Sequence, residues 1–178
     1  MLISSNTADT GKTAVGLPEV VKQAHPHTWT FSGEGIFSWT VFRFYRARLF
    51  VAGERYEPEA AHVLDLEYLR SLPASQIVSI AMDEIKRLRA CDDAQLTGWS
   101  QSLLSFLPDV SLGDRLIGVF TPGTGVSFYA ADTLLGVIND PVFGFINIPK
   151  GLLYDIVRHP LLQRLNRIKQ VGLSSVVY

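Results

Sequence analysis

Aromatic and β-branched residues dominate the segment from Thr28 to Gly53, in contrast to the small and polar residues before it. Two strands are predicted there, one around Trp29 and Phe31 and one over the run 37–51, with Gly33-Glu34-Gly35 between them. Side chains of the second strand alternate between two faces. One face holds Trp39, Val41, Arg43, Tyr45, Ala47, Leu49 and Val51, and the other holds Phe42, Phe44, Arg46, Arg48 and Phe50. Because both faces carry large apolar groups, we expect this strand to be central and covered on both sides.

The rest of the pattern alternates between strands and helices. A third strand is predicted over 62–69, and Pro73 opens a helix whose apolar residues recur at helical spacing. Asp92 or Asp93 can cap a second helix, which Pro108 ends. Three short strands with turn residues between them follow, over 115–121, 126–130 and 134–138. Strands, then two helices, then strands predict an α+β domain built on an antiparallel sheet with helices packed on it.

Composition limits the function classes. The 178 residues are 47% hydrophobic and 19% charged, which is ordinary for one globular domain. The net charge of −1 predicts no general attraction to nucleic acid. No apolar run is long enough to span a membrane, and the first residues have no signal-peptide core. We therefore expect a cytoplasmic protein, unless an export signal precedes this sequence; the oligomeric state stays open.

The sequence offers few residues that could bind a metal or a cofactor. His25, His27, His62 and His159 show no metal-ligand spacing, and the single cysteine, Cys91, allows no disulfide within the chain. Gly11-Lys12-Thr13 is similar to the end of a phosphate-binding loop but lacks the glycine five places earlier. No metal and no cofactor are expected.

Several motifs stand out between residues 28 and 138: Gly33-Glu34-Gly35, the strand 44–49, the helical pair with Asp83-Glu84 and Trp99, the stretch 113–123, and Val126-Ser127-Phe128-Tyr129. Together they resemble bacterial chalcone isomerase-like domains. The resemblance implies the open β-sandwich of that family. A shared fold alone does not carry the activity.

The resemblance also implies where catalytic residues would stand. True chalcone isomerases use an arginine after the Gly-x-Gly segment, a threonine, a tyrosine and an asparagine. At the matching positions this chain has Phe37, Tyr45, Ile77 and Glu84. Replacing the arginine by a phenyl ring removes the charge that would stabilise the developing anion. No catalytic residue is therefore assigned, although an intramolecular lyase of the chalcone isomerase type with rearranged residues stays an alternative.

Non-catalytic relatives with this fold bind fatty acids and use an arginine and a tyrosine for the carboxylate. Here Arg43 and Tyr45 are the candidate ligand-binding residues, because they share one face of the predicted strand. The alternative is that Tyr45 belongs to a plain core and that Arg43, Arg46 and Arg48 reach solvent. The function predicted from the resemblance is binding of a fatty acid or another small apolar or amphipathic ligand.

The last forty residues differ from the rest. Asn139-Asp140-Pro141-Val142-Phe143-Gly144 and the helix opened by His159-Pro160 resemble the start of HD-domain phosphohydrolases, but the sequence stops before that family's metal-ligand histidines. An inactive fragment of such a nucleotide phosphohydrolase is therefore a further alternative. The expected organisation is a flexible leader over 1–26, the chalcone isomerase-like domain over 27–138, and a helical tail over 139–178.

Overall fold

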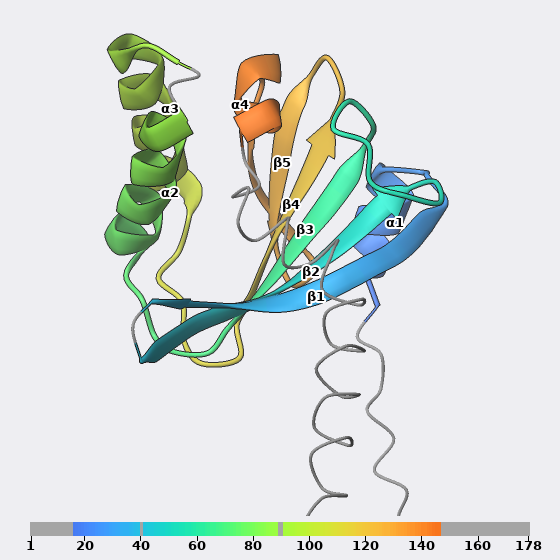
Figure 1. Ribbon diagram of the computed structural model, residues 1–178, viewed down its shortest axis with the longest axis horizontal. Helices are drawn as coiled ribbons and strands as arrows, with labels where there is room; N and C mark the ends of the chain where they lie inside the picture. Colours follow the sequence, from blue (N-terminus) through green and yellow to red (C-terminus); the bar gives the residue numbers. More distant parts are fainter. Residues whose placement is uncertain (1–15, 40, 89–90, 147–178) are drawn as a thin grey trace, which may run out of the picture.

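The computed structural model describes residues 16–39, 41–88 and 91–146. Its centre is a six-stranded antiparallel sheet in which every strand pairs with its neighbours in sequence (Figure 1). The strands are β1 (Trp29–Trp39), β2 (Phe42–Ala52), β3 (His62–Tyr68), β4 (Arg115–Thr121), β5 (Gly125–Ala130) and β6 (Thr133–Ile138). The helices are α1 (Glu19–Ala24), α2 (Ala74–Leu88), α3 (Asp93–Phe106) and α4 (Pro141–Ile146).

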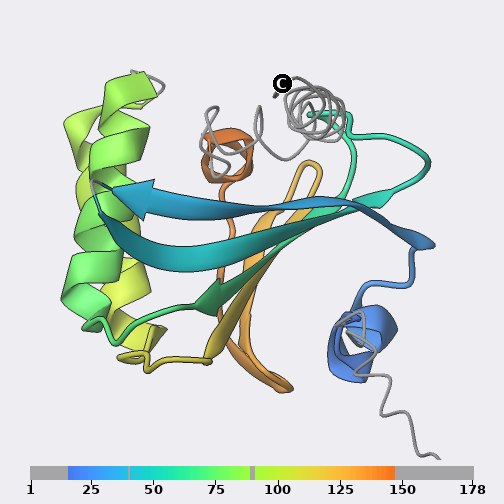
Figure 2. The same ribbon diagram turned by 60° about the horizontal axis from the view of Figure 1, so that its bottom comes forward.

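Helices α2 and α3 are inserted between β3 and β4 and lie side by side against one face of the sheet, whereas α1 lies on the other side (Figures 1 and 2). Local signals explain where α3 begins. Asp92 accepts a hydrogen bond from the backbone N–H of Gln95, and the Gln95 side chain accepts one from the N–H of Asp92. This reciprocal capping satisfies two backbone donors that the first turn leaves open.

The α+β class and the antiparallel sheet predicted from the sequence are confirmed. One strand boundary was wrong. Gly33-Glu34-Gly35 does not separate two strands but lies inside β1, where Gly35 pairs with Ala47. The chain instead turns between Trp39 and Phe42, within the run that was predicted as a single strand.

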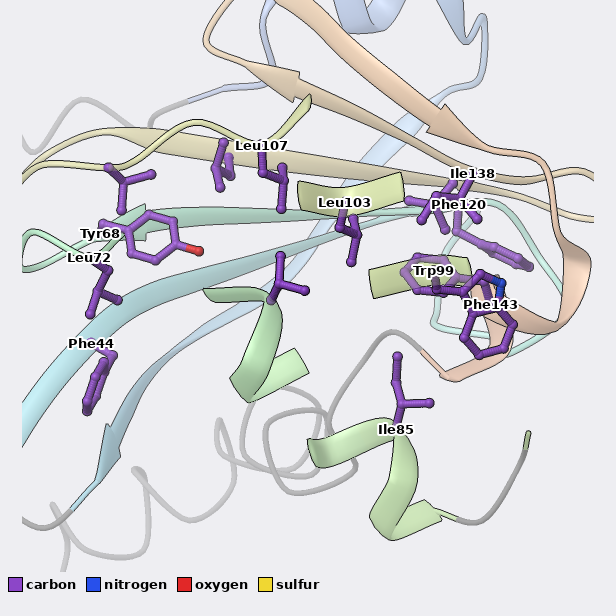
Figure 3. Close-up of a cluster of buried hydrophobic side chains, with 14 residues drawn as sticks. Phe44, Tyr68, Leu72, Ile85, Trp99, Leu103, Leu107, Phe120, Ile138 and Phe143 are labelled. Carbon is purple, nitrogen blue, oxygen red and sulfur yellow. The ribbon is translucent and has the colours of Figure 1, made fainter. Parts of the chain in front are cut away.

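The face toward α2 and α3 carries the largest apolar cluster. It includes Phe44, Tyr68, Ile85, Trp99, Leu103, Phe120, Ile138 and Phe143 (Figure 3). The second helix of the pair, α3, approaches β6 so closely that a Cβ on Gly136 would overlap the Phe106 ring. Gly136 therefore allows this close packing of the helix on the sheet.

The opposite face of the sheet carries a second apolar cluster and a group of charged side chains. Leu17 and Val21, from the N-terminal segment, are buried against β2, β3, β4 and β5. The indole Nε1 of Trp29 donates to the carbonyl of His25, whose ring nitrogen Nε2 lies 3.0 Å from the Tyr129 hydroxyl. Helix α1, which lies within the predicted leader, thus packs on the sheet.

Beside this second cluster lies an ion-pair cluster of Arg48, Asp65, Glu67 and Arg115. Asp65 is completely buried and accepts two hydrogen bonds from Arg115, at 3.1 and 2.6 Å. Arg48 is 5% exposed and bonds both Asp65, at 3.5 Å, and Glu67. The expectation that Arg48 reaches solvent was wrong, because the carboxylates on β3 satisfy its guanidinium inside the protein.

The first part of the predicted tail also packs on the domain. Phe143 of α4 is 1% exposed and contacts the rings of Trp99 and Phe128. The Trp99 indole donates to Asp140 over 3.0 Å. The helix predicted after His159-Pro160 and the Gly11-Lys12-Thr13 motif lie outside the described residues. Within the described part of the chain, no helix has the length and apolar character needed to cross a bilayer.

Candidate functional site

A cavity of about 630 Å³ lies between the sheet and the pair α2–α3. Its volume is in the range of small-molecule pockets. Alternate residues of the central strands β3 and β4 form the floor of the cavity. These residues are apolar except at the two ends of β3. On β3 they are His62, Leu64, Leu66 and Tyr68, and on β4 they are Leu116, Gly118 and Phe120. Side chains of β1, β2, β5, α2, α4 and the end of α3 complete the wall.

Two tyrosines lie next to each other in this lining. Tyr45 on β2 pairs in register with Tyr68 on β3, and their ring centroids are 5.9 Å apart. Tyr45 also stacks on Phe37 of β1, with centroids 5.0 Å apart. Figure 3 shows the Tyr68 hydroxyl directed toward the middle of the apolar cluster.

Burial raises the pKa of Tyr45 well above its usual range, and the nearby Glu84 carboxylate raises it further. Burial raises the pKa of Tyr68 in the same way. Both phenols are therefore neutral hydrogen-bonding groups at physiological pH.

Charged groups enter the lining only from α2, among the described residues. Glu84 and Arg87 both border the cavity and form an ion pair with each other, in which Arg87 Nε donates to Glu84 over 3.1 Å. The Arg87 side chain is largely exposed, so this pair marks the side on which the cavity meets solvent. Since the two charges compensate each other, the interior carries no net charge from them.

The other polar residue of the floor is His62, which is 4% exposed. Its Nδ1 lies 3.0 Å from the carbonyl oxygen of Ala60, and its ring packs against Tyr56 and Phe120. A carbonyl can only accept, so Nδ1 carries the proton. Burial lowers the pKa of His62, partly offset by this hydrogen bond. His62 is therefore a neutral imidazole at physiological pH.

The structure brings only one of the two sequence-predicted ligand residues to the cavity. Tyr45 lines it, whereas Arg43 is exposed and is not among the lining residues. The reason is a β-bulge. Phe37 pairs with Tyr45, but Ser38 pairs with Arg43, so Phe44 is an extra residue in the ladder. The simple alternation that put Arg43 and Tyr45 on one face does not continue across a bulge.

The four positions carried over from chalcone isomerases come together in space. Phe37, Tyr45, Ile77 and Glu84 all border the cavity, although they come from three different elements. Sequence reasoning missed two further polar groups, Tyr68 and His62. Both stand at the ends of a predicted strand with two leucines between them, and that pattern was the only available signal.

Metal binding has no candidate in the described residues. No group of three or more His, Cys, Asp or Glu side chains there is arranged to hold an ion. His159 lies outside the described part of the chain.

Comparison with known proteins adds a fold relationship. No family model matches the chain, and no curated protein matches its sequence. Among solved structures, it is similar to the Arabidopsis thaliana fatty-acid binding protein AtFAP1, with a TM-score of 0.53 and 8% sequence identity. The match covers 66% of this chain and 76% of the plant protein. At that identity the likeness shows the fold alone. The chain therefore has the chalcone isomerase-like α+β fold, an open antiparallel sheet with helices packed on it.

Proposed function

We propose that this protein binds a small amphipathic molecule of the fatty-acid class in the cavity and catalyses no reaction on it. The observation that carries the proposal is the composition of the lining, which is an apolar slot with two adjacent neutral phenols, Tyr45 and Tyr68. Such a slot buries an acyl chain, and the phenols donate hydrogen bonds to a carboxylate head group. The fold likeness to a fatty-acid binding protein supports the same conclusion.

Two properties of the lining argue against the isomerase alternative. Phe37 offers no charge where the isomerases have arginine. The phenols, whose pKa values are raised, do not ionise near neutral pH and so are poor general bases. With chalcone substrates we expect ring closure at the uncatalysed rate.

We assign the head-group contact to Tyr45 together with Tyr68, and keep Arg43 as the test of the sequence prediction. A hydrogen bond to a charged group contributes about 1.5–3 kcal/mol, so losing one hydroxyl should weaken binding by about ten- to a hundredfold. The experiment is isothermal titration of palmitate into the full chain and into Tyr45→Phe and Tyr68→Phe.

The matched control is Tyr56→Phe, because Tyr56 packs on His62 without lining the cavity. Palmitate binding to the wild type that weakens in both cavity variants but not in Tyr56→Phe supports the proposal. Absence of binding to the wild type would overturn it.

A further inference from the structure

His62 and Tyr68 stand at opposite ends of the same cavity floor. Both residues belong to β3 and line the cavity, with Leu64 and Leu66 between them on that face. At a rise of about 3.3 Å per residue, the six residue steps from His62 to Tyr68 span about 20 Å. The floor therefore has a polar group at each end and only apolar side chains in between.

The free nitrogen of His62 is accessible from the cavity. Every fully buried side-chain nitrogen or oxygen among the described residues has a hydrogen-bond partner. His62 makes its hydrogen bond through Nδ1, and no described residue bonds Nε2. Because the residue is buried from bulk solvent and borders the cavity, the space that Nε2 meets is the cavity.

The tautomer determines what Nε2 can recognise. With the proton on Nδ1, held by the Ala60 carbonyl, Nε2 is a hydrogen-bond acceptor and has no proton to donate. An acyl chain that ends there in a methyl group would displace water and leave this acceptor unpaired, which is unfavourable. A chain that ends there in a hydroxyl group would donate to it.

We propose that the cavity is built for a long-chain ligand that is polar at both ends, with a carboxylate at Tyr45 and Tyr68 and a terminal hydroxyl at His62. This inference rests on the proposed function and narrows it from fatty acids in general to ω-hydroxy acids. His62 is then the residue that distinguishes the two chain ends, and it contacts the ligand directly.

The test compares palmitate with ω-hydroxypalmitate by isothermal titration, in the wild type and in His62→Leu. The wild type should bind the hydroxy acid at least about fivefold tighter, because only this ligand satisfies Nε2. In His62→Leu the order should reverse, because the hydroxyl is then buried against an apolar side chain. The ratio of the two affinities should change by at least about thirtyfold between the proteins.

Two controls make the result specific. Tyr56→Phe, which alters the ring beside His62 outside the cavity, should keep the wild-type ratio. The shorter ω-hydroxydecanoate, which cannot reach His62 from the tyrosines, should show no dependence on His62. An independent measurement on the unaltered protein is the ¹⁵N resonance of His62 Nε2, which should differ between the two complexes, because ω-hydroxypalmitate donates a hydrogen bond to Nε2 and palmitate leaves it without a donor.

The outcomes separate the two proposals. Equal ratios in wild type and His62→Leu, or a ¹⁵N shift that is the same with both acids, would overturn the hydroxyl site and leave fatty-acid binding intact. Failure of the wild type to bind either acid would overturn the proposed function and the hydroxyl site with it.

Discussion

The two faces of the central strands differ in packing: residues on one face line the cavity, and their sequence neighbours on the other face are closely packed. On β3, Leu64 and Leu66 line a cavity, whereas Val63, Asp65 and the residues around them are sealed under α1 or within ion pairs. The cavity face has neutral polar groups with accessible hydrogen-bonding atoms. The packed face has the charged residues Arg48, Asp65, Glu67 and Arg115, which bond one another.

This difference explains how a cavity can lie against one face of the sheet while the strands are held in place from the other face. A space next to a sheet is kept open only if the strands that border it are held elsewhere, since apolar walls otherwise gain by closing. The ion-pair cluster ties β2, β3 and β4 together on the packed face, and the Arg115 guanidinium also donates to the carbonyl of Gly16 before α1. We expect changes on the packed face to affect stability and changes on the cavity face to affect binding.

The largest effect is expected from Asp65→Asn on the packed face. Asp65 is completely buried between Arg48 and Arg115, and losing its charge removes the carboxylate that pairs with Arg115 and one of the carboxylates that pair with Arg48. Breaking a buried ion pair costs about 3–5 kcal/mol. Urea unfolding measures this loss. Glu57→Gln is the control, because its pair with Arg55 is exposed and contributes at most about 1 kcal/mol. Equal losses in the two variants would contradict the account.

Gly118→Leu on the cavity face should weaken palmitate binding and leave the free energy of unfolding nearly unchanged. A Cβ at Gly118 meets only ordinary contacts, 3.6 Å from Val126 and 3.9 Å from Phe128, and a larger side chain would extend into the cavity. Palmitate affinity should fall at least tenfold, about 1.4 kcal/mol, with a change below about 1 kcal/mol in the free energy of unfolding. Gly98→Leu, on the exposed side of α3 where nothing lies within 4 Å, should leave affinity unchanged. An unaltered affinity in Gly118→Leu would show that the ligand binds elsewhere.

Acidification should destabilise the protein partly through His62. Its pKa is lowered in the folded state, so below the unfolded value of about 6.5 the unfolded chain binds more protons than the folded one. The free energy of unfolding then falls as the pH drops from about 6.5 toward the lowered pKa, by up to about 1.4 kcal/mol per pH unit from this group. Urea unfolding at several pH values should show a shallower fall in His62→Leu than in the wild type. The slope should be unaltered in Leu112→Ala, where the substituted side chain is exposed and does not titrate. The same slope in all three proteins would mean that His62 titrates alike in both states.

The smallest effect is expected from Arg43→Ala, which tests the sequence prediction directly. Arg43 is exposed and does not border the cavity, so its removal should change palmitate affinity by less than about twofold. The measurement is the same titration, beside Tyr45→Phe. A tenfold loss in Arg43→Ala would restore the predicted Arg43–Tyr45 pair as the head-group site.

Residue periodicity was sufficient for the architecture and insufficient for the site. The strand around His62, the helices α2 and α3 and the antiparallel arrangement followed from apolar spacing, caps and turn residues, whereas the turn between Trp39 and Phe42 was missed. The position of Arg43 could not be predicted from periodicity, because a bulge is a local departure from the two-residue period and leaves little trace in the sequence. The burial of Arg48 could not be predicted either, since its partners come from β3 and are fixed only by the strand register.

The central claim is that an acyl chain occupies one face of the sheet and leaves the other untouched. The direct measurement is a methyl ¹H–¹³C titration of the full chain with palmitate. Leu64, Leu66 and Leu116 on the cavity face should shift, whereas their sequence neighbours Val63 and Ile117, sealed on the packed face, should not. Shifts of equal size on both faces, or no shift on either, would contradict the claim.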